Sequence, residues 1–411
     1  MNQKKKNTGS KYILIFVLII AVFVGIKAFG KSITVFNRVE CSIERKEGTP
    51  IVTNTVKLTF TGDIMCHSYQ YNEAYDYTTG EYDFSHNFQD MKKYFDEADM
   101  VIGNLETVFA GKEVGISDYP CFNSPDSFGK AIKEAGFDFV TTANNHCMDK
   151  GMKGTLRTLD ILDELGLDHT GTYRSQEERD NIYIKEVNGI NIAFLSYTYG
   201  TNGIRVPENW LVNIMNEELI KNDIKRAKEL EPDMIVVLPH MGNEYEEYVR
   251  DIFKNWANMM IEAGADIVVA SHPHILQEME MVEVTEDDGS TRMGYIMYSM
   301  GNFISSQTTP PRNASILLNI EIEKTTNEEA VIKKVSFVPI WTQFQNANWK
   351  NHFVVRSVYE MLTLSDDELK ITLRNKDVSR LKEIHYETTK TLLKRDIPLE
   401  NIQNEYIFYE F

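Results

Sequence analysis

The chain is 411 residues long, enough for one large domain with appendages, and its 42% hydrophobic and 25% charged residues exclude a wholly disordered protein. Acidic residues outnumber basic ones by 61 to 43, and residues 1–56 carry nine basic and three acidic residues, so the rest of the chain carries about −24. This charge argues against nucleic acid as a partner, because nonspecific binding to nucleic acid requires neutralisation of phosphates.

The first element in chain order is an apolar segment, Tyr12–Gly30, interrupted only by Lys27 and preceded by four lysines. Nineteen helical residues span about 28 Å, close to the hydrocarbon thickness of a bilayer. Basic residues favour the cytoplasmic side, so we predict a cytoplasmic tail (1–11), a single-pass anchor in the cell membrane (12–30) and an extracellular main domain. A cleaved signal peptide is the alternative, because Ala28-Phe29-Gly30 fits a small-x-small cleavage site.

Residues 31–56 are polar and of mixed charge, and we expect them to form a linker. From Val56 onwards, short runs rich in valine and isoleucine end in polar residues, a pattern typical of buried strands. There are six such runs: Val56–Thr61, Met100–Ile102, Phe137–Thr142, Ile235–Leu238, Ile267–Ala270 and Ile296–Ser299.

Helices are predicted between these strands. Glu217–Leu230 is a charged segment closed by Pro232, and leucines 156, 159 and 162 mark another helix. A third has one apolar face, formed by Phe253, Trp256, Ala257, Met260 and Ile261. Alternating strands and helices predict a layered α/β architecture, with a site where the strands end.

A β-hairpin interrupts this alternation. Ile182–Val187 and Ile190–Tyr197 flank an Asn-Gly turn, which indicates two sheets instead of one doubly wound sheet. After Ser306 the polar motifs stop. Ser315–Glu323 and Val331–Pro339 are predicted to be paired strands, and Asp366–Arg395 a charged surface helix. We expect residues 307–411 to be a C-terminal extension that packs on the domain.

The polar residues at the strand ends form the candidate site. Five of the nine histidines lie there, together with three oxygen-bearing side chains: His67, His146, His240, His272, His274, Asp63, Glu106 and Asn145. These donors suit borderline divalent metals. Each residue taken alone is better explained as a turn or capping residue. Their joint placement predicts a metal site.

The loop His272-Pro273-His274 adds detail to this prediction. In an extended chain its two imidazoles point to opposite sides, which suits two metals that flank one loop, with Glu106 as a bridge. Cys66 and Cys147 lie in neighbouring loops and are either soft metal ligands or small buried residues. A disulfide between them is a further option.

Six motifs, in order, resemble the CapA (PgsA) family of poly-γ-glutamate capsule synthesis proteins, which is related to the calcineurin-like metallophosphoesterases: Thr61–His67, Gly103–Glu106, Ala143–Asp149, His240–Tyr245, Ser271–His274 and Tyr298–Phe303. The resemblance implies a domain over residues 57–306 with a four-layered α/β/β/α fold. It also implies capsule-synthesis membrane proteins and an anionic polymer such as poly-γ-glutamate as partners.

The resemblance further implies a dinuclear site for Mn, Fe or Zn. One ion would be held by Asp63, Glu106 and His274, and the second by Glu106, Asn145, His240 and His272. His67 is a further candidate ligand, and His146 with Asp149 would form the catalytic pair. The ions would activate a water for attack on a phosphoryl or amide centre.

Two departures from the phosphoesterase pattern leave the reaction open. His67 follows Asp63 by four residues where the pattern has two, and Glu106 stands where aspartate is usual. Three functions therefore stay under consideration. The chain is a component of capsule synthesis or export, a surface phosphoesterase or amide hydrolase unrelated to capsule, or a non-enzymatic scaffold of a membrane polymer synthetase.

Overall fold

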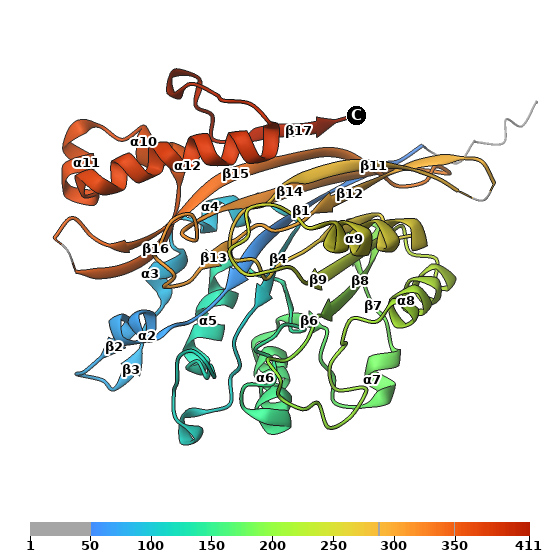
Figure 1. Ribbon diagram of the computed structural model, residues 1–411, viewed down its shortest axis with the longest axis horizontal. Helices are drawn as coiled ribbons and strands as arrows, with labels where there is room; N and C mark the ends of the chain where they lie inside the picture. Colours follow the sequence, from blue (N-terminus) through green and yellow to red (C-terminus); the bar gives the residue numbers. More distant parts are fainter. Residues whose placement is uncertain (1–50, 287, 349) are drawn as a thin grey trace, which may run out of the picture. The chain divides into compact units, whose positions relative to one another are not determined.

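The computed structural model describes residues 51–411, apart from 287 and 349 (Figure 1). Residues Ile51–Phe411 form one compact unit. The predicted tail, the predicted anchor over 12–30 and most of the predicted linker lie outside the described residues. Within the described residues, no helix combines the length and the apolar character needed to cross a membrane.

The first sheet is mixed and contains nine strands. Seven follow the order β16 (Asn351–Ser357), β15 (Val331–Gln345), β14 (Ala314–Thr325), β1 (Thr53–Ile64), β4 (Met100–Leu105), β5 (Phe139–Thr141) and β6 (Asp168–Thr170). The strand β13 (Asn302–Ile304) pairs with the end of β1, and β17 (Tyr406–Glu410) pairs with β15. β1 is parallel to β4 and antiparallel to β14, so Phe60 lies opposite both Ile102 and Leu318.

The second sheet contains six strands. Their order is β11 (Met279–Thr285), β12 (Thr291–Met297), β10 (Ile267–Val269), β9 (Met234–His240), β8 (Ile190–Thr198) and β7 (Tyr183–Val187). The predicted hairpin is confirmed as β7 and β8. Asn188 and Gly189 between them both have positive φ, 49° and 78°, as a tight two-residue hairpin requires.

Three apolar layers hold the two sheets and their helices together. The central layer lies between the sheets, and Phe60, Phe139 and Phe194 belong to it. A second layer packs α5 (Asp126–Ala135) and α6 (Gly151–Leu165) on the outer face of the first sheet. A third packs α8 (Glu217–Glu229) and α9 (Asp251–Ala263) on the outer face of the second sheet. The predicted α/β/β/α sandwich is therefore confirmed for the part of the chain that the structure describes.

The C-terminal quarter of the chain takes part in the first sheet through β14 to β17. The helix expected over 366–395 is divided into α11 (Asp366–Thr372) and α12 (Asn375–Leu393), and α12 lies along β15 (Figure 1). The other described elements are short: α2 (Ser68–Ala74), β2 (Tyr75–Asp76), β3 (Glu81–Tyr82), α3 (Ser85–Phe88), α4 (Lys92–Phe95), η2 (Lys112–Val114), α7 (Gln176–Asp180), α10 (Val358–Leu362) and η3 (Leu399–Asn401).

Candidate metal centre

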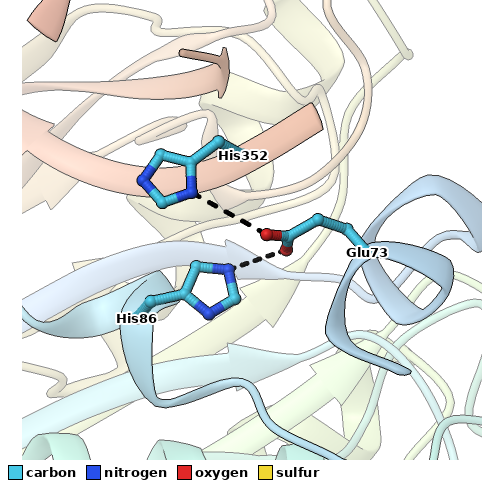
Figure 2. Close-up of side chains that lie close together, drawn as sticks. All are labelled: Glu73, His86 and His352. Carbon is cyan, nitrogen blue, oxygen red and sulfur yellow. Dashed lines mark hydrogen bonds and ion pairs between the residues drawn. The ribbon is translucent and has the colours of Figure 1, made fainter. Parts of the chain in front are cut away.

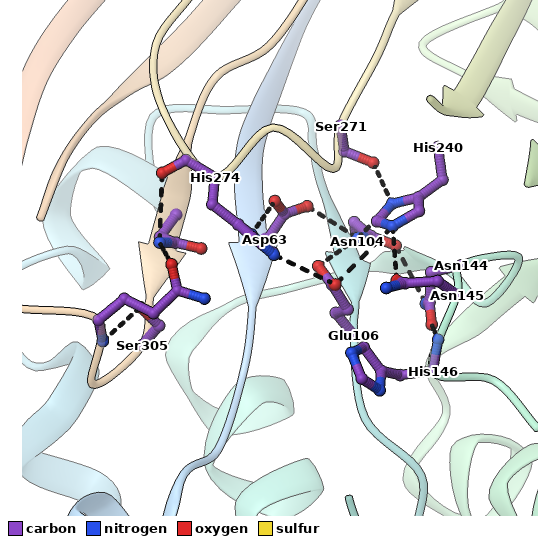
Figure 3. A network of polar contacts seen from close by, with 12 residues as sticks. Asp63, Asn104, Glu106, Asn144, Asn145, His146, His240, Ser271, His274 and Ser305 are labelled. Carbon is purple, nitrogen blue, oxygen red and sulfur yellow. Dashed lines mark hydrogen bonds and ion pairs between the residues drawn. The ribbon is translucent and has the colours of Figure 1, made fainter. Parts of the chain in front are cut away.

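The predicted strand ends meet in one buried cluster (Figure 3). Asp63 lies near the end of β1, opposite Asn104 of β4, and Glu106 directly follows β4. His240 ends β9, and the loop after β10 carries the other two imidazoles. The side chains of Asp63 and Glu106 are fully buried. Strands from both sheets thus bring carboxylates and imidazoles to the same place.

Two groups of side chains in this cluster have the composition and spacing of metal ligands. One contains Asp63, Glu106 and His240, and the other contains Glu106, His272 and His274; the donor atoms within each group lie within 4.8 Å of one another. Glu106 is common to both, as a bridging ligand would be. Its Oε1 lies 3.7 Å from His240 Nε2 and 3.7 Å from His274 Nε2.

The cluster contains buried polar atoms that the protein itself leaves without partners. Glu106 Oε1 and His272 Nδ1 form no hydrogen bond within the described residues. An unpaired buried carboxylate oxygen is costly unless a cation or a donor satisfies it. Carboxylate, imidazole and amide donors suit borderline divalent ions. The residues present therefore fit a divalent metal centre.

The loop between His272 and His274 is not extended, contrary to our expectation from the sequence. Both residues have positive φ, 107° and 59°, and their rings lie 5.9 Å apart. The loop therefore brings both imidazoles toward Glu106 instead of directing them to opposite sides. Of the two ligand groups in the structure, one contains His272 and His274 and the other contains Asp63 and His240. The assignment expected from the sequence had instead placed Asp63 and His274 on the same metal ion. The contact expected for that division also exists, since His274 Nδ1 lies 3.1 Å from Asp63 Oδ2.

Asn145, a predicted ligand, contacts His240. Its Oδ1 lies 2.8 Å from His240 Nε2, on the side of the imidazole that also faces Glu106. The other ring nitrogen, Nδ1, lies 2.8 Å from the hydroxyl of Ser271. The Ser271 contact orients the imidazole so that Nε2 is presented to the cluster.

Asn104 is a residue to which sequence reasoning gave no role. Its Nδ2 donates to Asp63 Oδ1 at 2.8 Å and lies 3.5 Å from Glu106 Oε2. Its Oδ1 accepts from Thr141 at 3.1 Å and from Asn144 at 3.3 Å. Asn104 thus holds the two carboxylates in place. In the sequence, this role was indicated only by the position of Asn104 two residues before Glu106, in the same motif.

His146 and Asp149 form a buried pair, and His146 lies near the candidate ligands (Figure 3). His146 Nδ1 lies 2.7 Å from Asp149 Oδ2, and that oxygen also accepts the backbone N–H of Phe122 at 2.7 Å. The ring of Phe122 packs edge-on against His146, with centroids 4.7 Å apart. These contacts fix the ring and engage Nδ1, whereas Nε2 forms no hydrogen bond within the described residues.

His67 lies outside both ligand groups. Its Nδ1 is 3.3 Å from the backbone N–H of Ser306 and 3.3 Å from Gln70 Oε1, so the ring contributes to the start of α2.

Cys66 and Cys147 are free thiols, and the structure does not pair them. Burial raises the pKa of both, to about 12 for Cys147, which favours the protonated form over the metal-binding thiolate.

Burial sets the protonation of the imidazoles. It lowers the pKa of His240 well below the usual value, that of His272 to about 3 and that of His67 to about 4, and neighbouring imidazoles lower the first two further. Neutral imidazole is the form that binds metals. Burial and the nearby Asp63 raise the pKa of Glu106 well above its usual value, as expected for a carboxylate that lacks a cation.

Aromatic residues and one arginine surround the cluster. The half-exposed Tyr199 packs against His272, with ring centroids 4.6 Å apart. Tyr245 lies 6.0 Å from the ring of His274, and the guanidinium of Arg312 stacks on Tyr245 at 3.6 Å from the ring centre. Arg312 forms no ion pair with any residue that the structure describes. A positive charge is therefore available for an anionic ligand.

Fold and site together define a two-sheet α/β protein with a buried histidine–carboxylate cluster, a candidate metal centre, at its strand ends. Residues 57–307 match the family described as "Bacterial capsule synthesis protein PGA_cap". The match covers more than half of the chain, and the chain belongs to this family.

Two curated relatives carry related names. The chain is 31% identical over 265 residues to "Capsule biosynthesis protein CapA" of Bacillus anthracis, with 61% of this chain and 60% of the relative covered. It is 29% identical over 336 residues to "PGA biosynthesis protein CapA" of Bacillus subtilis (strain 168), with 78% and 79% covered. The match thus spans about three fifths of the Bacillus anthracis protein and about four fifths of the Bacillus subtilis protein.

Solved structures show more distant likenesses. NAD nucleotidase (NadN) of Haemophilus influenzae is 12% identical, with a TM-score of 0.44 over 83% of this chain and 57% of that one. The calcineurin-like phosphoesterase YfkN of Bacillus subtilis is 12% identical, with a TM-score of 0.38 over 82% of this chain and 99% of that one.

Proposed function

We propose that the protein is a membrane-anchored, extracellular component of poly-γ-glutamate capsule synthesis or export that acts through a dinuclear metal site. Family membership and the names of the two CapA relatives support the link to capsule. The anchor is supported by the apolar sequence of Tyr12–Gly30. The observation that carries the metal-dependent part is Glu106, whose buried and unpaired Oε1 faces two imidazoles.

The ligands of the proposed centre are Asp63, Glu106, Asn145, His240, His272 and His274. Divalent ions held there would supply Lewis acidity and polarise a phosphoryl or carbonyl oxygen of the substrate. Asn104 holds Asp63 and Glu106 so that neither carboxylate rotates away from the other ligands. Ser271 fixes the imidazole of His240 in the same way.

His146 is proposed to move the proton in this reaction. The Asp149 carboxylate accepts from Nδ1 and so leaves Nε2 to give a proton to a leaving group or to take one from a nucleophile. The packing of Phe122 on the ring limits the directions in which Nε2 can point. Such chemistry serves cleavage of a phosphoester or of an amide bond in a polymer.

The substrate is proposed to be anionic. Arg312 is a positive charge without an ion pair in the described part of the chain, and its stacking on Tyr245 places it beside His274. A guanidinium binds carboxylates and phosphates in a bidentate manner, and stacking limits the entropy lost in doing so. Both the free α-carboxylates of poly-γ-glutamate and a phosphoryl group fit this arrangement.

The test is complementation of a poly-γ-glutamate-producing bacterium from which its own relative of this family has been deleted. The full-length protein should restore surface polymer, and Glu106→Gln should not, because it removes the shared anionic ligand at nearly constant shape. His169→Ala is the matched control, since within the described residues the His169 imidazole pairs with Asp163 and belongs to neither ligand group.

Each contrary result has its own meaning. Polymer restored by Glu106→Gln would show that the metal site is dispensable, and would favour the scaffold function. Failure of the wild-type protein, present at the membrane in normal amount, would contradict the role in capsule and favour a surface hydrolase that acts on another polymer.

A further inference from the structure

A second cluster of metal-ligating side chains lies away from the strand ends and shares no residue with the first. It consists of Glu73 in α2, His86 in α3 and His352 in β16, whose donor atoms lie within 4.8 Å of one another (Figure 2). Some 266 residues of sequence separate His86 from His352, so only the fold brings them together. None of the three belongs to the polar motifs at the strand ends.

The distances in this cluster are close to those of a coordination sphere. Glu73 Oε2 lies 2.7 Å from His86 Nε2, and Glu73 Oε1 lies 3.8 Å from His352 Nδ1. Donor atoms around a tetrahedral zinc ion lie about 3.3 Å apart, given bonds of about 2.0–2.1 Å. The two observed distances bracket that value. Side-chain movements of about 1 Å would place all three donors on one ion.

The two imidazoles are arranged around the carboxylate. Their rings are stacked, with centroids 5.3 Å apart and planes inclined by 11°, and each directs one nitrogen at Glu73 (Figure 2). Asn87 Nδ2 also lies 3.2 Å from His86 Nε2, so a metal would displace that contact. The other donors face each other without further hydrogen bonds in the described residues.

Exposure and charge also favour an ion here. The side chains are 15% exposed for Glu73, 23% for His86 and 28% for His352, so the donors are shielded but can be reached from solvent. Glu73 would supply one carboxylate donor beside the two imidazoles.

We propose that Glu73, His86 and His352 bind a zinc-like divalent cation, which joins the edge strand β16 to the helices α2 and α3. Two imidazoles and one carboxylate form a donor set that zinc accepts, with a fourth position left for solvent. Neighbouring contacts also connect β16 to α3 and to the segment after it, since Asn87 donates to the carbonyl of Phe353 and Arg356 pairs with Asp90.

Because of where β16 lies in the first sheet, an ion bound at this cluster would stabilise the structure. β16 is the last strand in the order of the first sheet, and an exposed edge strand is prone to fraying and to pairing with other chains. The cluster lies next to the site where β16 packs on α2 and α3. A bound ion would hold this edge in place without contributing to the chemistry at Glu106.

The experiment measures zinc bound by the full-length protein after dialysis against buffered Zn²⁺. The central site is first disabled by the paired change His240→Ala and His272→Ala, and one zinc per chain should remain. Its affinity should fall at least tenfold on His86→Ala, His352→Ala or Glu73→Gln. His169→Ala, which alters a histidine–carboxylate pair without a third ligand, should leave it unchanged.

Two results would overturn the proposal: no zinc retained by the disabled protein, or zinc retained with equal affinity after His86 or His352 is removed. If the paired change prevents folding, the wild-type protein and His352→Ala are compared directly and should differ by one zinc per chain. Zinc should also raise the melting temperature of the wild-type protein more than that of His352→Ala. If the three side chains only share a proton and bind no metal, neither the zinc content nor the effect of zinc on the melting temperature would differ between the two proteins.

Discussion

At the scale of single residues, the centre divides into side chains that would hold a metal and side chains that would act beside it. His240 Nε2 faces both Glu106 and Asn145, so it belongs to the first kind. His146 belongs to the second, because its Nδ1 is engaged by Asp149 and it lies in neither ligand group. This division leads to opposite expectations for the two histidines.

We therefore expect His240→Ala or His272→Ala to abolish both metal occupancy and function. His146→Ala should keep the metal and lower activity by about 10²–10⁴-fold, the usual contribution of a general acid or base. Metal content by mass spectrometry and polymer formation by the same protein preparation check the two halves together. Metal loss from His146→Ala would show that it is a ligand, and unchanged function would favour the scaffold.

Much of this site was predictable from sequence, because the residues concerned lie at or next to the ends of recognisable strands. Asp63, Glu106 and His240 belong to this group. The direction of His272 and His274 was not predictable, since it depends on positive φ at two non-glycine residues. The role of Asn104 depends on partners from three other segments. The cluster of Glu73, His86 and His352 carries no local signal at all.

At the scale of elements, the end of β1 fixes the position of Asp63. Gly62 precedes it at the point where β13 pairs with β1, and Asp63 N–H donates to the carbonyl of Gly301 at 3.0 Å. A Cβ on Gly62 would lie 1.9 Å from that carbonyl oxygen and 3.1 Å from the backbone nitrogen of Phe303. Only glycine allows the two strands to approach this closely.

Gly62→Ala should therefore displace β13 and Asp63 together. Overpacking of this kind costs about 1–3 kcal/mol of folding free energy, and the shift of Asp63 should also weaken metal binding. Chemical denaturation measures the first effect and metal titration the second. Gly200→Ala is the matched control, because an added Cβ there meets no atom within 4 Å. Equal stability of the two variants would contradict the argument.

The strands also differ in how well their own sequences predict them. β1, β4, β9 and β10 were predicted because their valines and isoleucines are bounded by turn residues, whereas β6 and β13 were not. Asp168–Thr170 and Asn302–Ile304 are three residues long and owe their pairing to neighbouring strands. Such short strands are determined by tertiary contacts instead of by their own composition.

At the scale of the whole molecule, the proposal places the main domain outside the cell. The prediction is that protease treatment of intact cells removes residues 57–411 while a fragment that contains Tyr12–Gly30 stays in the membrane. The physical reason is the basic stretch before the apolar segment, which favours a cytoplasmic amino terminus. Amino-terminal sequencing supplies the control, since a mature protein that begins near Lys31 would show that the segment is cleaved.

The charge of the whole molecule conflicts with an anionic substrate. Residues after 56 carry about −24, so the protein repels poly-γ-glutamate at long range. The proposed attraction comes from the metals and from Arg312, which has no ion pair within the described residues. Short contacts of this kind are screened less by salt than repulsion between distant surface charges.

Binding of poly-γ-glutamate should therefore require divalent metal and should strengthen as salt rises from about 0.01 to 0.15 M, where the Debye length falls from about 30 to 8 Å. Fluorescence anisotropy of labelled polymer measures this. Arg312→Ala should weaken binding about tenfold, since a charge-assisted hydrogen bond contributes about 1.5–3 kcal/mol. Arg395→Ala removes the same charge from an exposed position and should have little effect. Affinity that falls steadily with salt would show that the polymer binds a basic surface instead of the metal centre.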